Sequence, residues 1–195
     1  MSDHCEILVD VDVSLDDAEQ VRDNVIAELI RLGLIEPNLN AKCVLGGLGH
    51  PVGPNVQLYI RDSEELQFWT LQTSGVEPTV GYHFNELGLG ESCEGFRCPA
   101  CTNSFTSDHS AFLDRLGEAF ENWYKSHTPT AMVCPACNAS NLLEIWDCKP
   151  PLGFGNLSFR FWNWLPFDRS GWMIDIPDLI AMLTGHRFVL TYAHI

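Results

Sequence analysis

The tetrapeptide Cys98-Pro99-Ala100-Cys101 occurs a second time, unchanged, as Cys134-Pro135-Ala136-Cys137. Two Cys-x-x-Cys pairs together supply the four thiolates of a tetrahedral zinc site. Each pair forms a tight turn whose backbone N–H groups can hydrogen-bond the sulfurs, and the proline stiffens that turn. A zinc ion held by four cysteines has no open position for catalysis. We therefore predict a structural Zn²⁺ cofactor with Cys98, Cys101, Cys134 and Cys137 as its ligands.

The residues around the two pairs favour metal binding over redox chemistry. A single Cys-x-x-Cys also serves dithiol redox sites, in which the pair follows a buried strand and opens a helix. Here Cys98-Pro99-Ala100-Cys101 leads into the polar Thr102-Asn103-Ser104, and the second pair leads into Asn138-Ala139-Ser140. The order of strand, turn and polar loop resembles that of a zinc ribbon, over these two turns and their flanks only. The resemblance implies a metal-stabilised module and no particular activity.

A long insertion separates the two pairs. Between Cys101 and Cys134 lie 32 residues, more than the about 15–20 of the commoner spacing. A helix is predicted over about 107–126, with Ser107 or Asp108 as its cap. Its apolar residues recur at helical spacing, at Phe112, Leu116, Ala119, Phe120 and Trp123. The zinc module is therefore expected to carry a helical insertion.

Four other side chains are alternative ligands. Cys93 lies just before the first pair and Cys148 follows the second, so either could replace one of the four cysteines. His109 and His127 flank the predicted helix and are conceivable fourth ligands. The plainer interpretation of the remaining cysteines, Cys5 and Cys43 among them, is that they are small buried hydrophobic residues.

The N-terminal part of the chain has the pattern of a small α+β unit. Glu6–Val13 is predicted as a strand, and Ser14 with Asp17 resembles a helix cap. A helix follows from Ala18, with Gly33 as its stop. Further strands are predicted over four ranges, with a glycine-rich loop at 46–54: 41–45, 56–60, 65–71 and 78–84.

Aromatic residues dominate the C-terminal part. Seven lie within 19 residues: Phe154, Phe159, Phe161, Trp162, Trp164, Phe167 and Trp172. They form either core or a protein-binding patch, and a strand there places Phe161 on one face and Trp162 with Trp164 on the other. Strands are also predicted over 142–146, 173–176 and 187–195, and Pro177 should begin a helix that Gly185 closes.

The fold class expected is α+β: a mixed-sheet unit combined with a zinc-ribbon module carrying a helical insertion. Residues 1–90 form an acidic unit, 91–150 form the zinc module, and 151–195 form a strand–helix–strand segment that packs with the first unit. The two ends of the chain are expected to share one sheet.

The charge excludes one common use of zinc modules. The net charge is −15, and residues 1–97 alone contain 17 acidic and 5 basic side chains. Nucleic-acid binding requires a basic surface, which this chain lacks. An acidic surface can instead attract a basic protein, although it can also serve solubility alone. No apolar run reaches the about 20 residues that span a bilayer, and Met1–Glu6 lacks a signal-peptide pattern. We expect a cytoplasmic protein with reduced thiols.

Three functions follow from these patterns. The first is a non-enzymatic, zinc-stabilised binding protein, an adaptor or an inhibitor of a basic protein. The second is a thiol redox or metal-responsive protein that uses its Cys-x-x-Cys pairs. The third is an enzyme with a site around His50, His83 and the aspartates Asp10 and Asp12, which would share a strand face. No nucleophile–base motif is present, and the first function is preferred.

Overall fold

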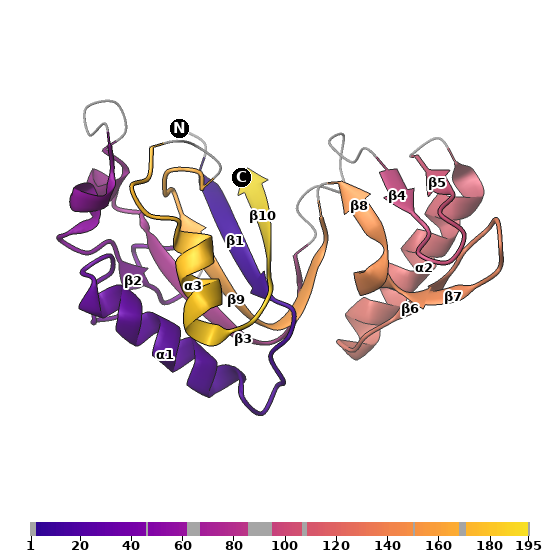
Figure 1. The fold of residues 1–195 in the computed structure, drawn as a ribbon, viewed down its shortest axis with the longest axis horizontal. Coiled ribbons are helices and arrows are strands. Elements are labelled where there is room, and N and C mark those ends of the chain that lie inside the picture. The colour runs from indigo at the N-terminus through magenta and orange to yellow at the C-terminus, as the bar shows by residue number, and fades with distance from the viewer. Residues whose placement is uncertain are drawn as a thin grey trace.

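The computed structural model describes residues 3–45, 47–61, 67–85, 95–106, 109–149, 151–167 and 171–194. Within these ranges the chain forms three α-helices and ten strands, all paired antiparallel (Figure 1). The predicted α+β class is therefore confirmed. None of the described helices combines the length and apolar character needed to cross a membrane.

A five-stranded sheet contains strands from both ends of the chain. Its order is β10-β1-β9-β3-β2, and the strand bounds are β1 His4–Asp10, β2 His50–Pro51, β3 Gly75–Asn85, β9 Gly153–Trp162 and β10 Phe188–His194. β1 pairs along its whole length with β10, from His4 opposite His194 to Asp10 opposite Phe188. The two ends of the chain thus lie side by side.

Two helices, α1 (Ala18–Arg31) and α3 (Ile176–Thr184), cover one face of this sheet (Figure 1). The buried stripe of α1 consists of Ala18, Val25, Ile26 and Leu29. It joins a core with Leu8 of β1 and with Leu157 and Phe159 of β9. Burying each large aliphatic side chain contributes about 1.5–3 kcal/mol, so this face accounts for much of the stability of the sheet.

The ends of α1 follow from local sequence. Gly33 has a φ of 70°, and the Leu34 N–H donates to the Leu29 carbonyl at 2.9 Å while the Gly33 N–H donates to that of Ile30 at 2.8 Å. This is the Schellman arrangement that a C-terminal glycine permits. At the other end, Ser14 Oγ accepts the Asp17 N–H at 3.2 Å, as in a cap, but a turn intervenes before the helix begins at Ala18.

The aromatic residues of β9 belong to the core. Phe159 and Phe161 are fully buried against the helices, and Trp162 is buried on the opposite face of the sheet with Cys5 and Val9. The prediction that Trp164 shares the face of Trp162 is wrong. Asn163 has a φ of 57°, which redirects the chain, and Trp164 packs 5.1 Å from Phe161 between ring centroids.

Residues 95–149, here called the cysteine lobe, lie beside the five-stranded sheet and its helices, here called the sheet lobe (Figure 1). The cysteine lobe contains a three-stranded sheet and a hairpin. Its elements are β4 Gly95–Arg97, β5 Ser104–Phe105, α2 Ser110–Ser126, β6 Ala131–Val133, β7 Ser140–Leu142 and β8 Asp147–Lys149.

The predicted insertion helix is present as α2. Its buried residues are Phe112, Leu116, Ala119 and Trp123, and Phe112 stacks on Phe105 with 5.1 Å between ring centroids. The cap is His109, whose side chain accepts the Phe112 N–H at 3.3 Å. Ser107 and Asp108, the predicted caps, lie outside the described residues, as do the predicted segment boundaries at 90 and 150.

Several predicted strands are absent from the described ranges. Residues 41–45 form turns, and 3-10 helices occupy Val56–Tyr59, Phe68–Thr70 and Leu143–Ile145. Residues 173–175 form no strand, and Ile176 already belongs to α3. Within the predicted glycine-rich loop, His50 and Pro51 form β2. Short apolar runs fit a strand and a buried irregular segment equally well, because periodicity alone does not separate them.

Candidate metal centre

The first cysteine turn begins directly after β4. The Cys98 N–H donates to the Asn103 carbonyl at 2.9 Å, and the Thr102 N–H donates back to the Cys98 carbonyl at 2.9 Å. Thr102 has a φ of 60°, in the left-handed region. These bonds close the turn around Pro99 and Ala100, so that the sulfurs of Cys98 and Cys101 lie on the same side of the turn.

The second turn, directly after β6, repeats this arrangement bond for bond. The Cys134 N–H donates to the Ala139 carbonyl at 2.9 Å, and the Asn138 N–H donates to the Cys134 carbonyl at 2.9 Å. Asn138 has a φ of 59°, the counterpart of Thr102. The identical tetrapeptides therefore form identical turns.

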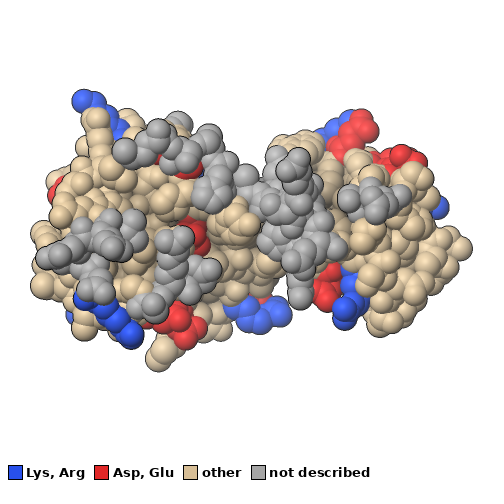
Figure 2. Space-filling view, turned by 90° about the horizontal axis from the view of Figure 1, so that it is seen from above, with Lys and Arg blue, Asp and Glu red and all other residues tan. Residues whose placement is uncertain are grey.

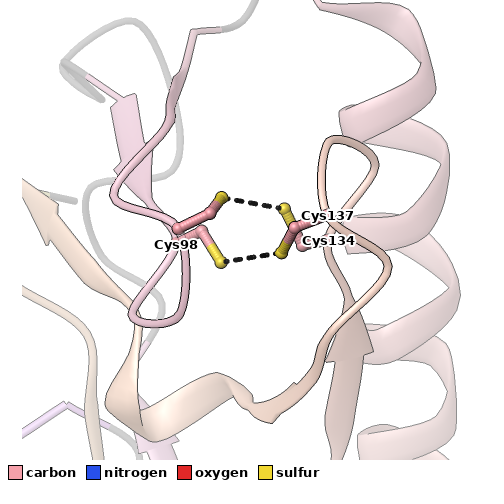
Figure 3. Close-up of side chains that lie close together, drawn as sticks. Cys98, Cys134 and Cys137 are labelled. Atoms are coloured by element: carbon pink, nitrogen blue, oxygen red, sulfur yellow. Dashed lines mark hydrogen bonds between the residues drawn. The ribbon is translucent and has the colours of Figure 1, made fainter.

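The two turns face each other and bring their four sulfurs together (Figure 3). Cys98 Sγ lies 3.9 Å from Cys137 Sγ, Cys101 Sγ lies 3.8 Å from Cys134 Sγ, and all four atoms lie within 4.8 Å of one another. A tetrahedral zinc ion with Zn–S bonds of about 2.3 Å separates its ligand sulfurs by about 3.8 Å. The cluster thus has the size that a metal ion requires. A disulfide needs about 2.05 Å, and the four cysteines are free thiols.

The pKa values of the first pair move in opposite directions. Burial opposes ionisation of Cys98, but the backbone N–H groups of Cys101 and Ala100, together with neighbouring thiols, lower its pKa overall. The Asn103 N–H favours ionisation of Cys101, but burial and the surrounding sulfurs outweigh it and raise that pKa. One thiolate therefore forms readily and penalises the next, as expected for close like charges. A cation at the centre removes this penalty.

One further side chain completes the surroundings of the cluster. Asn141 Nδ2 lies 3.9 Å from Cys98 Sγ, within the range of an N–H···S contact. Amide donors around ligating sulfurs partly neutralise the charge that four thiolates place on a divalent ion. Sequence reasoning missed Asn141, and only its closeness to the second turn signalled it.

The burial of the cluster is graded. Cys98 and Cys134 are completely buried and join the aromatic core of the cysteine lobe, while Cys101 is half-buried and Cys137 is exposed. The cluster therefore lies at the edge of that core, with Cys137 on its exposed side.

The alternative ligands are placed elsewhere. Cys148 is buried in the aromatic core, and its sulfur accepts the Leu152 N–H at 3.2 Å. His109 caps α2, and the ring of His127 packs 5.2 Å from that of Trp123. Within the described residues, none of these three joins the four-cysteine group. Cys93 lies outside the described ranges.

The two remaining cysteines are buried in the sheet lobe. Cys5 and Cys43 are 1 % and 2 % exposed, and burial raises the pKa of each thiol. They behave as the small hydrophobic residues that were predicted.

The structure does not bring the candidate catalytic residues together. His50 lies opposite Val76 near the start of β3, with its Nδ1 2.9 Å from the Glu36 carbonyl. His83 lies opposite Gly155 near the other end of β3, where burial lowers its pKa. The two histidines are therefore separated along the strand.

The two aspartates do not share a strand face, because β1 ends at Asp10 and Asp12 lies beyond it. Asp10 is fully buried: Oδ1 accepts the Asp12 and Val13 N–H groups at 3.0 Å, and Oδ2 lies 2.8 Å from His186 Nδ1. Asp12 instead accepts the Arg187 N–H at 2.8 Å. Both carboxylates tie the end of β1 to the start of β10, which is a structural arrangement.

Fold and site together define an α+β protein with a four-cysteine cluster positioned to hold a metal ion. Searches of protein-family models, of curated proteins and of solved structures found no match to this chain.

Proposed function

We propose that the four cysteines bind one Zn²⁺ and that the ion is structural. The observation that carries this proposal is the spacing of the sulfurs, 3.8 and 3.9 Å across the two turns. Four thiolates in a tetrahedral arrangement favour zinc among the common cellular metals. With all four positions taken by protein, the ion has none left for a substrate.

A structural role also suits the size of the cysteine lobe. Its sheet and hairpin consist of strands of two or three residues each, and units of this size often gain stability from a structural metal. Both turns follow such strands, so a shared ion would join the three-stranded sheet to the hairpin. Metal binding would then supply folding free energy directly.

The biological role proposed for this zinc-stabilised chain is binding of a basic protein, as an adaptor or inhibitor. The net charge of −15 supports it, because such a charge speeds encounter with a basic partner. On the face drawn in Figure 2, Lys and Arg side chains are scattered and form no continuous stripe. A stripe of that kind is what a phosphate backbone would require.

The zinc proposal is tested by metal analysis of the purified protein and a count of reactive thiols with and without a chelator. One zinc ion per chain, with four thiols exposed only on chelation, supports a closed structural site. Absence of metal, with both Cys-x-x-Cys pairs reactive and reversibly oxidised, would favour the redox function instead.

The partner proposal is tested with two labelled probes, an oligolysine peptide and a single-stranded DNA. We expect the zinc-loaded protein to bind the peptide in low salt, to lose it as salt is added, and to leave the DNA unbound. Binding of the DNA, or of neither probe, would contradict an acidic protein-binding surface.

A further inference from the structure

The two edges of the five-stranded sheet are protected very differently. β2 forms one edge with only two residues, one of them Pro51. β10 forms the other edge with the seven residues Phe188–His194, which include no Lys, Arg, Asp, Glu or Pro. Proteins normally shorten or charge an edge strand, or place a proline in it, because a long apolar edge pairs with any available strand. β2 follows this rule and β10 breaks it.

The outer side of β10 carries backbone groups that β1 does not use. Among the described residues, no strand pairs with β10 on the side away from β1. The Val11 N–H donates to the Arg187 carbonyl at 3.2 Å, so residue 187 and every second residue after it bond to β1. Phe188 and Leu190 alternate with these residues and therefore direct their N–H and C=O groups outward.

A cavity of about 440 Å³ adjoins this edge between the two lobes. β10 lies on the side of the sheet that faces the cysteine lobe (Figure 1). The sheet lobe contributes Val11 and Val189 to the cavity wall, and the cysteine lobe contributes Pro129 and Ile145. The volume falls in the range of about 300–1,000 Å³ that is typical of ligand pockets, and it is large enough for a side chain that packs on these four apolar residues.

The charged groups at the cavity favour a cationic neighbour. Arg187 lines the cavity, but its guanidinium is paired with the Asp12 carboxylate. Glu144 also lines it and is exposed, and its Oε2 accepts the Tyr82 hydroxyl at 2.8 Å. With Arg187 neutralised, Glu144 leaves a net negative charge beside a cavity that has both polar and apolar walls. The overall charge of −15 has the same sign.

We propose that an extended, basic segment of a partner protein adds to the outer edge of β10 as a sixth strand. It would pair with the outward groups of Phe188 and Leu190, place an apolar side chain in the cavity, and bring a lysine or arginine to Glu144. Strand addition of this kind draws its affinity from main-chain hydrogen bonds and its specificity from alternate side chains. The inference rests on the proposed function, because it assigns the acidic protein a docking surface.

The probe is a short fluorescent peptide of alternating lysine and valine, measured by anisotropy with the full, zinc-loaded chain. Its control is the same peptide with alternate backbone nitrogens methylated, which keeps every charge and side chain but removes the N–H donors along one edge. Because strand pairing tolerates many sequences, we expect the plain peptide to bind and the methylated one to bind at least about tenfold more weakly.

Two matched pairs of variants locate the surface. Leu190→Pro removes an outward N–H that β1 does not use, and Leu190→Ala loses the same side-chain packing but keeps that N–H. We expect Leu190→Pro to bind the plain peptide about tenfold more weakly than Leu190→Ala. Ile145→Lys places a cation in the cavity wall and should also weaken binding. Leu113→Lys, an equal change at a residue on α2 that does not line the cavity, should not.

The outcomes separate this inference from the proposal beneath it. Equal binding of the plain and methylated peptides by the zinc-containing protein would overturn strand addition at β10. It would still agree with the proposal of an acidic surface that binds basic proteins. Absence of peptide binding in low salt would overturn both the inference and the proposed partner class, while the zinc content of the same sample tests the metal site independently. A dimeric mass by light scattering that Leu190→Pro makes monomeric would assign the edge to a second copy of the chain and overturn the proposal.

Discussion

Thr102 and Asn138 each hold a left-handed backbone at the end of a cysteine turn, with φ values of 60° and 59°. This conformation costs most residues other than glycine about 1–2 kcal/mol, and asparagine tolerates it better than threonine. The cost is repeated at the same place in both turns, where the N–H groups of Thr102 and Asn138 donate to the Cys98 and Cys134 carbonyls and help to offset it. Coordination of the sulfurs by the proposed zinc ion would add to this compensation.

Replacing one sulfur by a weaker ligand should therefore release the lobe. We expect Cys134→Ser to lose zinc and to unfold the cysteine lobe, because zinc at such sites supplies about 10–16 kcal/mol of folding free energy. Losing even a third of this free energy would be comparable to losing the stability of a small domain. Metal content and near-ultraviolet circular dichroism report the change. Cys43→Ser, which alters an equally buried thiol outside the cluster, is the control and should keep its zinc. Unchanged zinc in Cys134→Ser would exclude this ligand set.

The pairing of Asp12 with Arg187 makes a second prediction at this scale. The hydrogen bond from Arg187 lowers the pKa of Asp12 to about 2, below the ordinary value of about 3.9. A depressed carboxyl pKa stabilises the fold above about pH 4, and that stabilisation is lost as the pH falls toward 2. Carbon-13 NMR of the Asp12 carboxyl should show a midpoint near 2 that returns toward 4 in Arg187→Gln. The stability effect is small, because the pair is solvent-screened. An ordinary midpoint in the unsubstituted protein would refute the pairing in solution.

Single residues were predictable where spacing carried the information. The four cysteines stand out because a repeated Cys-x-x-Cys has few uses. The bond between Asp10 and His186 was not predictable, because it joins residues 176 positions apart that meet only once β1 and β10 have paired. Asn141 was missed for a similar reason: its position near the second turn is a weak signal, and the sulfur that it approaches belongs to Cys98, 43 positions away.

At the scale of elements, helices were predicted better than strands. The stripe of α2 and the glycine after α1 are strong local signals, and both helices form where expected. The run Val56–Ile60 has the alternation of a strand but follows a Pro-Asn pair and forms a 3-10 helix through Tyr59. For a run of five residues, tertiary packing decides between a strand and a 3-10 helix, because intrinsic strand preference depends on context.

Gly33, just after α1, and Gly117, within α2, offer a matched test of local structure. Gly33→Ala should destabilise the protein by about 1–2 kcal/mol, because Gly33 is left-handed and an added Cβ would meet the Asn55 side chain. Gly117→Ala, within α2 and with open space around the added Cβ, should stabilise by about 0.5–1 kcal/mol. Denaturant unfolding of the zinc-loaded protein measures both. Effects of the same sign would contradict the assigned backbone conformations.

At the scale of the whole molecule, the two lobes have separate cores. The core of the sheet lobe combines α1 and α3 with β9, and the core of the cysteine lobe combines α2 with Phe96, Phe105 and Trp146. Phe154, in β9, packs into the second core, and the Tyr82–Glu144 hydrogen bond also joins the lobes. A metal ion bound by the four cysteines would stabilise only the core of the cysteine lobe. Removing the ion would therefore leave the core of the sheet lobe intact.

Hydrogen exchange of the full chain, with zinc bound and after chelation, tests this account most directly. We predict that chelation removes the protection of backbone amides throughout residues 95–149, while β1, β3 and β9 retain theirs, because only the cysteine lobe depends on the ion. Restoring zinc should restore protection. Unchanged protection in 95–149 after the metal has demonstrably left would show that the lobe folds without it, and would contradict a structural zinc site.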